Sequence, residues 1–435
     1  MSEWKQWDEK YIWHPFSPLA SEPPLAVERG EGAYLVTTDG RKILDVISSW
    51  WVNIHGHAHP EIASAITEQV HRLEQVIFAG FAHEPAAQLS ATLMSLLPDD
   101  QSKVFFSDDG STSTEVAIKL SLQYWYNQGQ PRRRILAMDG AYHGDTFGAM
   151  AVGDRSSIFN QPFVHHLFEV DYLPFPEGDG SNTLEAMDQL ASTEHAAFIF
   201  EPLVQGAGGM RMYSATLLDK LIQHARSQEI ICIADEVMTG FGRTGRMFAC
   251  DHLQTQPDIF CLSKGITGGF LPMGVTTVND KVAHAFDSKD KHKAFFHGHS
   301  YTANPLACAA ANASMRLLLT EEVQQSIARI GQCHASYLRR RQPNKHVLDA
   351  RQTGTILAIE LKVDDGGYTS TVKDRIYRHF LDRNLLLRPL GHVIYVLPPY
   401  VITDEELQWV YSEIDAFLDD LLTLEEISDV TVKTN

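Results

Sequence analysis

The stretch DIFCLSKGITGGF, residues 258–270, joins an apolar run to a glycine-rich turn. Its first half is short and almost continuously apolar, which predicts a strand that is buried on both faces. Lys264 ends this run, and the eight residues after it include no acidic side chain. A structural lysine extends its ammonium to water, whereas an amine held at the end of a buried strand is available for chemistry.

Four more apolar runs resemble this one, and helical segments separate them. They are KVFFS (103–107), RILAM (134–138), AAFIF (196–200) and IICIAD (230–235). Helical apolar spacing is evident over 59–76 and 86–97. Short buried strands that alternate with helices are typical of an α/β protein with a mostly parallel sheet covered by helices.

The two ends of the chain have a different pattern. The first ~50 residues read as short strands and turns, with Asp39-Gly40 as a hairpin turn. Beyond residue 320, helical stretches alternate with the apolar runs ILAIELKV and VIYVLPP. We therefore expect residues 1–55 to join a smaller α+β domain formed by 321–425, a large domain at 56–320, and a poorly ordered tail at 426–435.

Composition excludes several classes of partner. The chain has 435 residues and a formal net charge of −19, which argues against nucleic acid and anionic membranes. No apolar stretch approaches the ~20 residues of a membrane span. The five scattered cysteines lack metal or disulfide spacing, and the first residues lack the pattern of a signal peptide. We expect a cytoplasmic, soluble protein.

The strand ends carry the polar residues that a site needs. In parallel α/β sheets, ligands bind outside the carboxyl ends of the strands. The predicted strands end at Ser107–Gly110, Gly140–His143, Glu201, Asp235-Glu236 and Lys264. Hydroxyl groups, aromatic rings, acids and one amine are therefore expected to converge on one crevice.

Three of these strand ends form a chemically coherent set. Gly110, Ser111 and Thr112 open a helix, where free backbone N–H groups bind phosphate, although such hydroxyls also serve as ordinary helix caps. Asp235 ends an apolar strand, so it needs a partner, either a protonated pyridine nitrogen or an arginine such as Arg243 or Arg246. With Lys264 as a nucleophile toward an aldehyde, the set is what pyridoxal phosphate requires. The glycines of GFGRTG lack the spacing of a dinucleotide-binding motif.

The chain resembles a known family from about residue 11 to residue 420. IADEVMTGFGRTG (233–245) and PDIFCLSKGITGG (257–269) are similar to the signature of class III pyridoxal-phosphate aminotransferases. The resemblance implies a fold-type I homodimer with active sites at the subunit interface. It implies the following roles: Lys264 binds the cofactor aldehyde, Asp235 pairs with the pyridine nitrogen, Val237 and Tyr142 cover the two ring faces, Gly110, Ser111 and Thr112 hold the phosphate, and Ser300 reaches the phosphate of the neighbouring subunit.

Three further stretches are similar to the branch of this family that aminates 8-amino-7-oxononanoate in biotin biosynthesis. They are YIWHPF (11–16), SSWWVNIHGHAHP (48–60) and LLRPLGHVIYVLPPY (386–400). Flat rings suit an aliphatic chain, and the guanidinium of an arginine suits its carboxylate. The resemblance implies a substrate pocket formed by Phe16, Trp50, Tyr142, Asp145, Arg243, Gly298, Arg388 and Tyr395.

Other interpretations stay open for some of these residues. On a strand, Trp50 and Trp51 would point to opposite faces, so that one of them lines the pocket; the resemblance favours Trp50. Arg388 could instead pair with a nearby acid. His55, His57 and His59 alternate along the chain, but no carboxylate or cysteine cluster joins them, so we expect no metal.

The amino donor is not decided by these motifs. Many relatives have tyrosine after WHP, whereas this chain has Phe16, which lacks the hydroxyl. Most members of the branch use S-adenosylmethionine and some use lysine, and we favour S-adenosylmethionine. The alternatives to this function are another ω-amino-acid or diamine transaminase that uses pyruvate or 2-oxoglutarate, a related aminomutase, and a metal-binding protein built on the histidine-rich loop.

Overall fold

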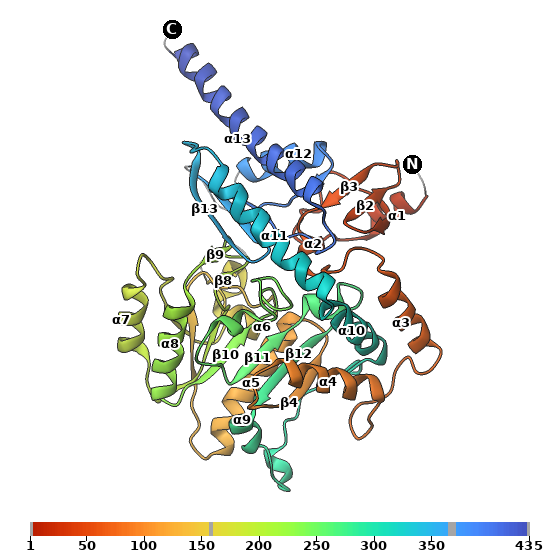
Figure 1. The fold of residues 1–435 in the computed structure, drawn as a ribbon. Coiled ribbons are helices and arrows are strands. Elements are labelled where there is room, and N and C mark those ends of the chain that lie inside the picture. The colour runs from red at the N-terminus through yellow and green to blue at the C-terminus, as the bar shows by residue number, and fades with distance from the viewer. Residues whose placement is uncertain (1–2, 156–159, 364–370, 433–435) are drawn as a thin grey trace.

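The computed structural model describes residues 3–155, 160–363 and 371–432 (Figure 1). A lower part is built around a large sheet, and an upper part contains both ends of the chain (Figure 1). Helix α13 (Asp404–Val432) includes much of the segment 426–435 for which the sequence predicts a poorly ordered tail, and residues 433–435 lie outside the described residues.

The largest sheet within the described residues has seven strands, in the order β4–β12–β11–β10–β7–β5–β6. Their bounds are β4 Gln101–Ser107, β5 Arg134–Met138, β6 Asp171–Leu173, β7 His195–Phe200, β10 Ile231–Asp235, β11 Ile259–Leu262 and β12 Gly274–Asn279. Strands β11, β10, β7, β5 and β6 pair in parallel, and β12 is antiparallel to both of its neighbours. The five predicted strands and the mostly parallel sheet are confirmed, although β4 is only partly buried and its Lys103 is exposed. The sequence pattern does not predict β6 or β12.

Both faces of this sheet are buried, which explains the nearly continuous apolar runs. On β10, Ile231 and Ile233 belong to an apolar cluster with helix α5 (Gly110–Asn127). The alternate residues Cys232 and Ala234 belong to a second cluster that includes helix α8 (Ala215–Ser227). Because successive side chains of a strand point to opposite faces, a strand that is covered on both sides is usually apolar at most positions.

The other helices of the lower part surround the sheet. They are α3 Pro60–Val70, α4 Glu84–Leu96, α6 Phe147–Ala151, α7 Ser181–Leu190, α9 Asp280–His284 and α10 Pro305–Leu318, with short 3-10 helices at Gln161–His166, Ala249–His252, Lys264–Thr267 and Lys291–Lys293. Helix α4 confirms the helical spacing predicted over 86–97, and α3 confirms the first part of the spacing predicted over 59–76, whereas residues 71–76 lie beyond the end of α3. Strands β8 (Val204–Gln205) and β9 (Arg211–Met212) form a separate hairpin.

The two ends of the chain share a sheet in the upper part. Strands β1 (Val27–Glu31), β2 (Tyr34–Thr37) and β3 (Lys42–Asp45) pair with β15 (Leu385–Leu386) in the order β1–β2–β3–β15. The remaining elements are α1 Glu3–Tyr11, α11 Glu321–Arg340, β13 Val347–Thr353, β14 Ile356–Leu361, α12 Thr371–Asp382 and β16 Val393–Val396. The hairpin predicted at Asp39-Gly40 is confirmed by the antiparallel pairing of β2 with β3. The domain limits at 55, 320 and 425 stay a prediction.

Residues Ser48–Trp51 form a left-handed turn, labelled α2, and not a strand. All four residues have positive φ, between 46° and 74°. Such backbone is costly for residues other than glycine and persists only where neighbouring contacts fix it. Here Ser48 Oγ donates to the carbonyl of Leu397 over 2.7 Å.

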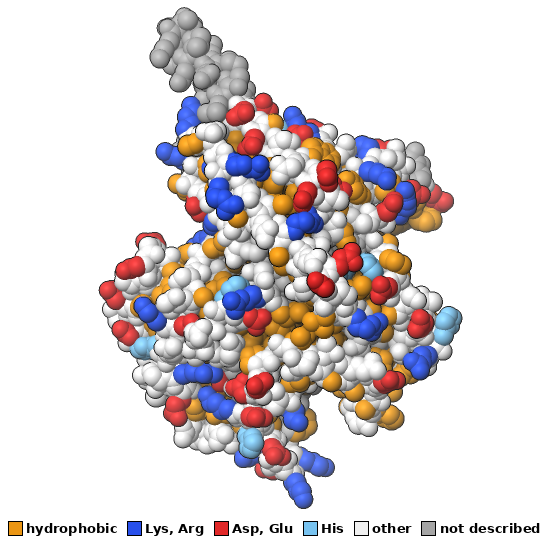
Figure 2. Space-filling model, in the orientation of Figure 1, with side chains coloured by type: hydrophobic (Ala, Val, Ile, Leu, Met, Phe, Trp, Pro, Cys, Tyr) orange, Lys and Arg blue, Asp and Glu red, His pale blue; other side chains and the backbone are white. Residues whose placement is uncertain are grey.

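Charged residues are distributed over the surface. Basic and acidic side chains are interspersed on the face shown in Figure 2. Among the helices in the described part of the chain, none combines the length and the apolar character that crossing a membrane requires.

A buried histidine makes the stability of the upper part depend on pH. His334 on α11 is fully buried, with Nδ1 joined to the hydroxyl of Tyr411 over 2.7 Å. Burial lowers the pKa of His334 to about 4, from 6.5. Between these pH values the unfolded chain binds a proton that the folded chain does not bind. The contribution of this neutral histidine to stability is therefore complete above pH 6.5 and declines as the pH falls toward 4.

We predict that His334→Gln weakens this pH dependence. Between pH 7 and pH 5, the loss of unfolding free energy should be smaller in the variant by about 2 kcal/mol, because the buried imidazole no longer resists protonation. Urea unfolding at both pH values measures this difference, with the exposed His71→Gln as the control. An equal loss in His334→Gln and in the unaltered protein would contradict the prediction.

Candidate active site

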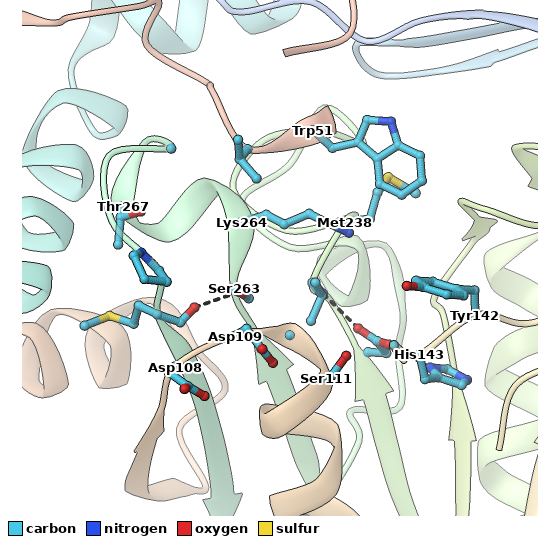
Figure 3. A pocket seen from close by; sticks show the side chains of 18 of the residues that line it. Trp51, Asp108, Asp109, Ser111, Tyr142, His143, Met238, Ser263, Lys264 and Thr267 are labelled. Atoms are coloured by element: carbon cyan, nitrogen blue, oxygen red, sulfur yellow. Dashed lines mark hydrogen bonds and ion pairs between the residues drawn. The ribbon is translucent and has the colours of Figure 1, made fainter. Parts of the chain in front are cut away.

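A cavity of about 400 Å³ opens at the carboxyl ends of the parallel strands (Figure 3). It is lined by residues that follow β4, β5, β7, β10 and β11, together with Trp51 and Val52. The predicted strand ends therefore converge, as the position of ligand sites in parallel sheets requires. Of the sequence-predicted site residues, the following line it: Gly110, Ser111, Tyr142, Asp235, Val237 and Lys264.

Lys264 begins a 3-10 helix after β11, and its own backbone has a φ of 44°. Its amine lies 4.5 Å from the ring centroid of Trp51 and points into the space that Tyr142 also faces (Figure 3). Burial lowers the pKa of Lys264 to about 8, although the carboxylates of Asp235 and Glu201 oppose this shift. This shift toward neutrality increases the fraction of the amine that is neutral, and therefore nucleophilic, near pH 7.

Asp235 ends β10 and is only 4% exposed. Its Oδ2 bonds to Nδ1 of His143 over 2.7 Å, and its Oδ1 accepts the backbone N–H of Val237 over 3.0 Å. Arginine is not its partner. Arg243 donates to backbone carbonyls of Pro398 and Trp51, and Arg246 donates to the carbonyl of Asp251.

The N-terminus of α5 supplies a polar cradle at the cavity floor. A Cβ atom at Gly110 would lie 2.7 Å from Cγ1 of Val237, so the close approach of these two residues requires glycine. The hydroxyl of Ser111 accepts the backbone N–H of Asp145 over 3.0 Å. Free N–H groups at such a helix start suit a phosphate.

Thr112 has a different environment. It forms a capping box with Asp109: its N–H donates to Oδ1 of Asp109 over 2.7 Å, and its hydroxyl accepts the N–H of Asp109 over 3.0 Å. The hydroxyl of Thr112 also donates to Asp108, and Thr112 is absent from the cavity lining. The capping interpretation that the sequence left open therefore describes this side chain.

Tyr142 and Glu201 approach the cavity from neighbouring loops. Burial raises the pKa of Tyr142, as does the carboxylate of Asp145 beside it. Glu201 follows β7, and burial raises the pKa of its carboxyl to about 7. The sequence places Glu201 and His143 at strand ends but assigns them no role in the site. Their position at the same strand ends as the predicted site residues could have identified them as candidates.

Trp51, and not Trp50, lines this cavity. The left-handed turn turns Trp51 inward, with 3% of it exposed, and leaves Trp50 37% exposed. Instead of lining the cavity, two residues that the resemblance assigns to the substrate pocket form hydrogen bonds with Trp51. Its Nε1 donates to the hydroxyl of Tyr395 over 3.1 Å, and its carbonyl accepts from the buried guanidinium of Arg243 over 3.2 Å.

Trp50 belongs to a second group, beside the cavity lining. Its ring packs on Phe16 at a centroid distance of 5.2 Å, and the guanidinium carbon of Arg388 lies 5.2 Å from the ring centroid of Trp50. Arg388 is half-buried, and no ion pair joins it to an acid of the described residues. The alternative pairing is therefore not seen in this part of the chain.

Gly298, Ser300 and Asp145 are exposed and are absent from the cavity lining. The rings of His55 and His59 contact each other at a centroid distance of 6.1 Å, but His55 and His57 have different hydrogen-bond partners. Nε2 of His55 bonds to the carbonyl of Ser314 over 3.0 Å, whereas Nε2 of His57 lies 3.0 Å from Asp45. No group of three potential metal ligands exists within 3–155, 160–363 and 371–432.

The residues that are present fit pyridoxal phosphate. A buried amine and a buried carboxylate, from the neighbouring strands β11 and β10, line the same cavity as the N-terminus of α5. Lysine, acid and phosphate cradle are the three groups by which a protein holds this cofactor.

Comparisons with known proteins agree with this geometry. The sequence profile of the family described as aminotransferase class-III matches residues 16–418. A protein of Synechococcus elongatus named adenosylmethionine-8-amino-7-oxononanoate aminotransferase is 50% identical to this chain, over 94% of this chain and 99% of that protein. A protein of the same name from Corynebacterium glutamicum is 36% identical, over 95% of this chain and 97% of that protein.

Solved structures give the same result. An enzyme of that name from Methanocaldococcus jannaschii has a TM-score of 0.90 at 33% identity, and the match covers 96% of this chain and 98% of that chain. An amine transaminase from an uncultivated Pseudomonas species, in its PLP-bound form, has a TM-score of 0.86 at 29% identity, covering 94% and 98%. This chain therefore belongs to the class III aminotransferases, which are pyridoxal-phosphate enzymes of fold type I.

Proposed function

We propose that this chain aminates 8-amino-7-oxononanoate to 7,8-diaminononanoate, with S-adenosylmethionine as the amino donor. The observation that carries the transaminase chemistry is the pair of Lys264 and Asp235 in one cavity. The choice of substrate rests on the name of the relative that is 50% identical over nearly the whole chain.

The chain's own residues have distinct tasks in this mechanism. When bound, pyridoxal phosphate supplies an aldehyde that condenses with amines and a ring that accepts electrons from the carbon that loses a proton. Asp235 would keep a proton on the pyridine nitrogen, and His143 fixes the orientation of that carboxylate. Ser111 and Gly110 would hold the phosphate at the start of α5, with Val237 and Tyr142 on the two sides of the ring.

Lys264 would first bind the cofactor aldehyde and then act as the acid–base group. Its neutral amine would then take the proton from the donor carbon and hold it for return. Burial lowers the pKa of Lys264, which increases the share of the amine that is neutral and able to accept this proton. Ping-pong kinetics follow, because the second substrate enters only after the first product has left.

The keto acid would be held by the group around Trp50. Aromatic rings exclude water from an aliphatic chain, and Phe16 and Trp50 lie in contact beside Arg388. The guanidinium of Arg388 would bind the distal carboxylate through charge-assisted hydrogen bonds. Asp145, Gly298, Tyr395 and Arg243 complete the proposed substrate pocket.

A homodimer in the cytoplasm is part of the proposal. Large apolar side chains near Ser300 are exposed in the single chain, with Phe296 78% and Tyr301 65% exposed, which suits contact with a second copy. In such a dimer Ser300 and Gly298 would serve the partner's site. The five cysteines are free thiols, as expected in a reducing compartment.

Lys264→Ala should abolish covalent attachment of the cofactor. Borohydride should fix pyridoxal phosphate to the unaltered protein, as a mass increase on the peptide that contains residue 264. Lys281→Ala, at the opposite end of the sheet, is the control and should retain the label. A label of equal yield in Lys264→Ala would remove the basis of the cofactor assignment.

The substrate assignment is tested by direct assay. Purified protein with pyridoxal phosphate and 8-amino-7-oxononanoate should form 7,8-diaminononanoate, detected by mass spectrometry, when S-adenosylmethionine is supplied. Lysine in its place tests the alternative donor. If no donor yields the diamine, but diamines transfer their amino group to pyruvate or 2-oxoglutarate, the rival transaminase activity is correct.

Arg388→Ala should raise the KM for the keto acid by about tenfold to a hundredfold, because a charge-assisted contact is lost. The half-reaction with the amino donor, followed by the cofactor's absorbance in single turnovers, should change little. Arg383→Ala is a matched control, since Arg383 is nearby and already pairs with Glu413 over 2.9 Å. Equal damage to both half-reactions would contradict the carboxylate role.

A further inference from the structure

A buried acid in the cavity wall forms no ion pair within 4 Å with a described residue, although it interacts electrostatically with His143 and Lys264. Glu201 is only 5% exposed, and its two carboxylate oxygens each accept one backbone N–H. Oε1 accepts from Tyr142 over 3.0 Å, and Oε2 accepts from Gly206 over 2.8 Å. The carboxylate therefore joins the loop that carries Tyr142 to the loop that follows Glu201 in the chain.

The hairpin of β8 and β9 makes further contacts with the Tyr142 loop. Nε2 of Gln205 donates to the carbonyl of Asp139 over 3.1 Å, and the guanidinium of Arg211 donates to the same carbonyl over 3.0 Å. Arg211 lies so close to Gly140 that a Cβ atom there would be 1.7 Å from its nitrogen. The hairpin and the Tyr142 loop therefore approach each other so closely at residue 140 that only glycine leaves room for Arg211.

The opposite side of the hairpin is held by the upper part of the molecule. Arg351, on β13, donates to the carbonyl of Met210 over 2.8 Å and to that of Gly209 over 2.6 Å. The same guanidinium pairs with Glu360 over 2.8 Å. A continuous set of hydrogen bonds thus leads from β13 through the hairpin and Glu201 to the backbone of Tyr142.

We propose that Glu201 is a positioning residue that, with the β8–β9 hairpin, fixes the ring of Tyr142 against the cofactor. The inference rests on the proposed function only in that Tyr142 covers a bound pyridoxal phosphate. Glu201 acts through the backbone of Tyr142, which sets where the Tyr142 ring stands in the cavity (Figure 3). A carboxylate suits this task because both of its oxygens accept, whereas an amide has one acceptor and one donor.

The test uses Glu201→Gln in the full-length protein. In this variant, the side-chain NH2 group of glutamine faces the backbone N–H of either Tyr142 or Gly206, and two donors cannot bond to each other. The Tyr142 loop should therefore shift. The dissociation constant for pyridoxal phosphate should rise about tenfold, the effect of one lost charge-assisted hydrogen bond. The visible circular dichroism of the bound cofactor, which reports how its ring is held, should change as well.

Glu236→Gln is the matched control. Glu236 is also fully buried and accepts two backbone N–H groups, from Ala249 over 3.0 Å and from Cys250 over 2.7 Å. It is absent from the cavity lining. Its amide variant should lose thermal stability yet keep the cofactor affinity and the circular dichroism of the unaltered protein.

A double-mutant cycle tests the route of action. In a Tyr142→Ala background, Glu201→Gln should cause little further loss of cofactor affinity, because the ring it positions is gone. If the two losses add, Glu201 acts elsewhere and the proposal is wrong. If Glu201→Gln does not fold, the milder Gln205→Ala replaces it, with a smaller change in the same direction expected and no change overturning the proposal.

The same measurements separate this inference from the proposed function. If the unaltered protein binds no pyridoxal phosphate through Lys264, the proposed function itself fails. If it binds the cofactor normally and Glu201→Gln matches it in affinity and circular dichroism, only the positioning role fails.

Discussion

The pairing of β10 with β11 determines where the reactive groups lie. Their parallel register sets Asp235 opposite Cys261, so the acid and Lys264 emerge at the same edge of the sheet. Both are removed from water there, which lowers the pKa of the amine. An isolated charged lysine is costly in an apolar wall, but burial shifts this amine, under the ring of Trp51, toward its neutral form, and the carboxylates of Asp235 and Glu201 stabilise the fraction that stays protonated.

Much of the lower part could be predicted from the sequence because its strands are covered on both faces. Most such strands are nearly continuous apolar runs, so they are easy to recognise in the sequence, and their ends locate the cavity. Strand β12 was harder to predict, since GVTTVN contains glycine and three polar residues. Their side chains find partners far away in the sequence: Thr276 donates to the carbonyl of Ser113, and Thr277 donates to Oε1 of Gln101. Tertiary contacts decided its conformation.

The side of the cavity formed near Trp50 and Trp51 could not be predicted from sequence patterns. A strand at SSWW is wrong because these four residues adopt positive φ. Contacts with both nearby and distant parts of the chain stabilise that backbone, such as those of Ser49 with Asp45 and of Ser48 with Leu397. Arg243 and Tyr395 both contact Trp51, Arg243 at the backbone carbonyl and Tyr395 at the indole N–H, and neither lines the cavity. Phe16, Trp50 and Arg388 form a separate group beside it.

The left-handed turn also has a consequence for the order of assembly. Its stabilising partners, Leu397 and Tyr395, lie 349 and 344 residues further along the chain from Ser48 and Trp51. During synthesis the strands of the large sheet emerge before those partners exist, and contacts of such long sequence separation form late. The aromatic wall is therefore completed only when nearly the whole polypeptide has been made, so an incomplete chain lacks this side of the cavity even if its central sheet has already formed.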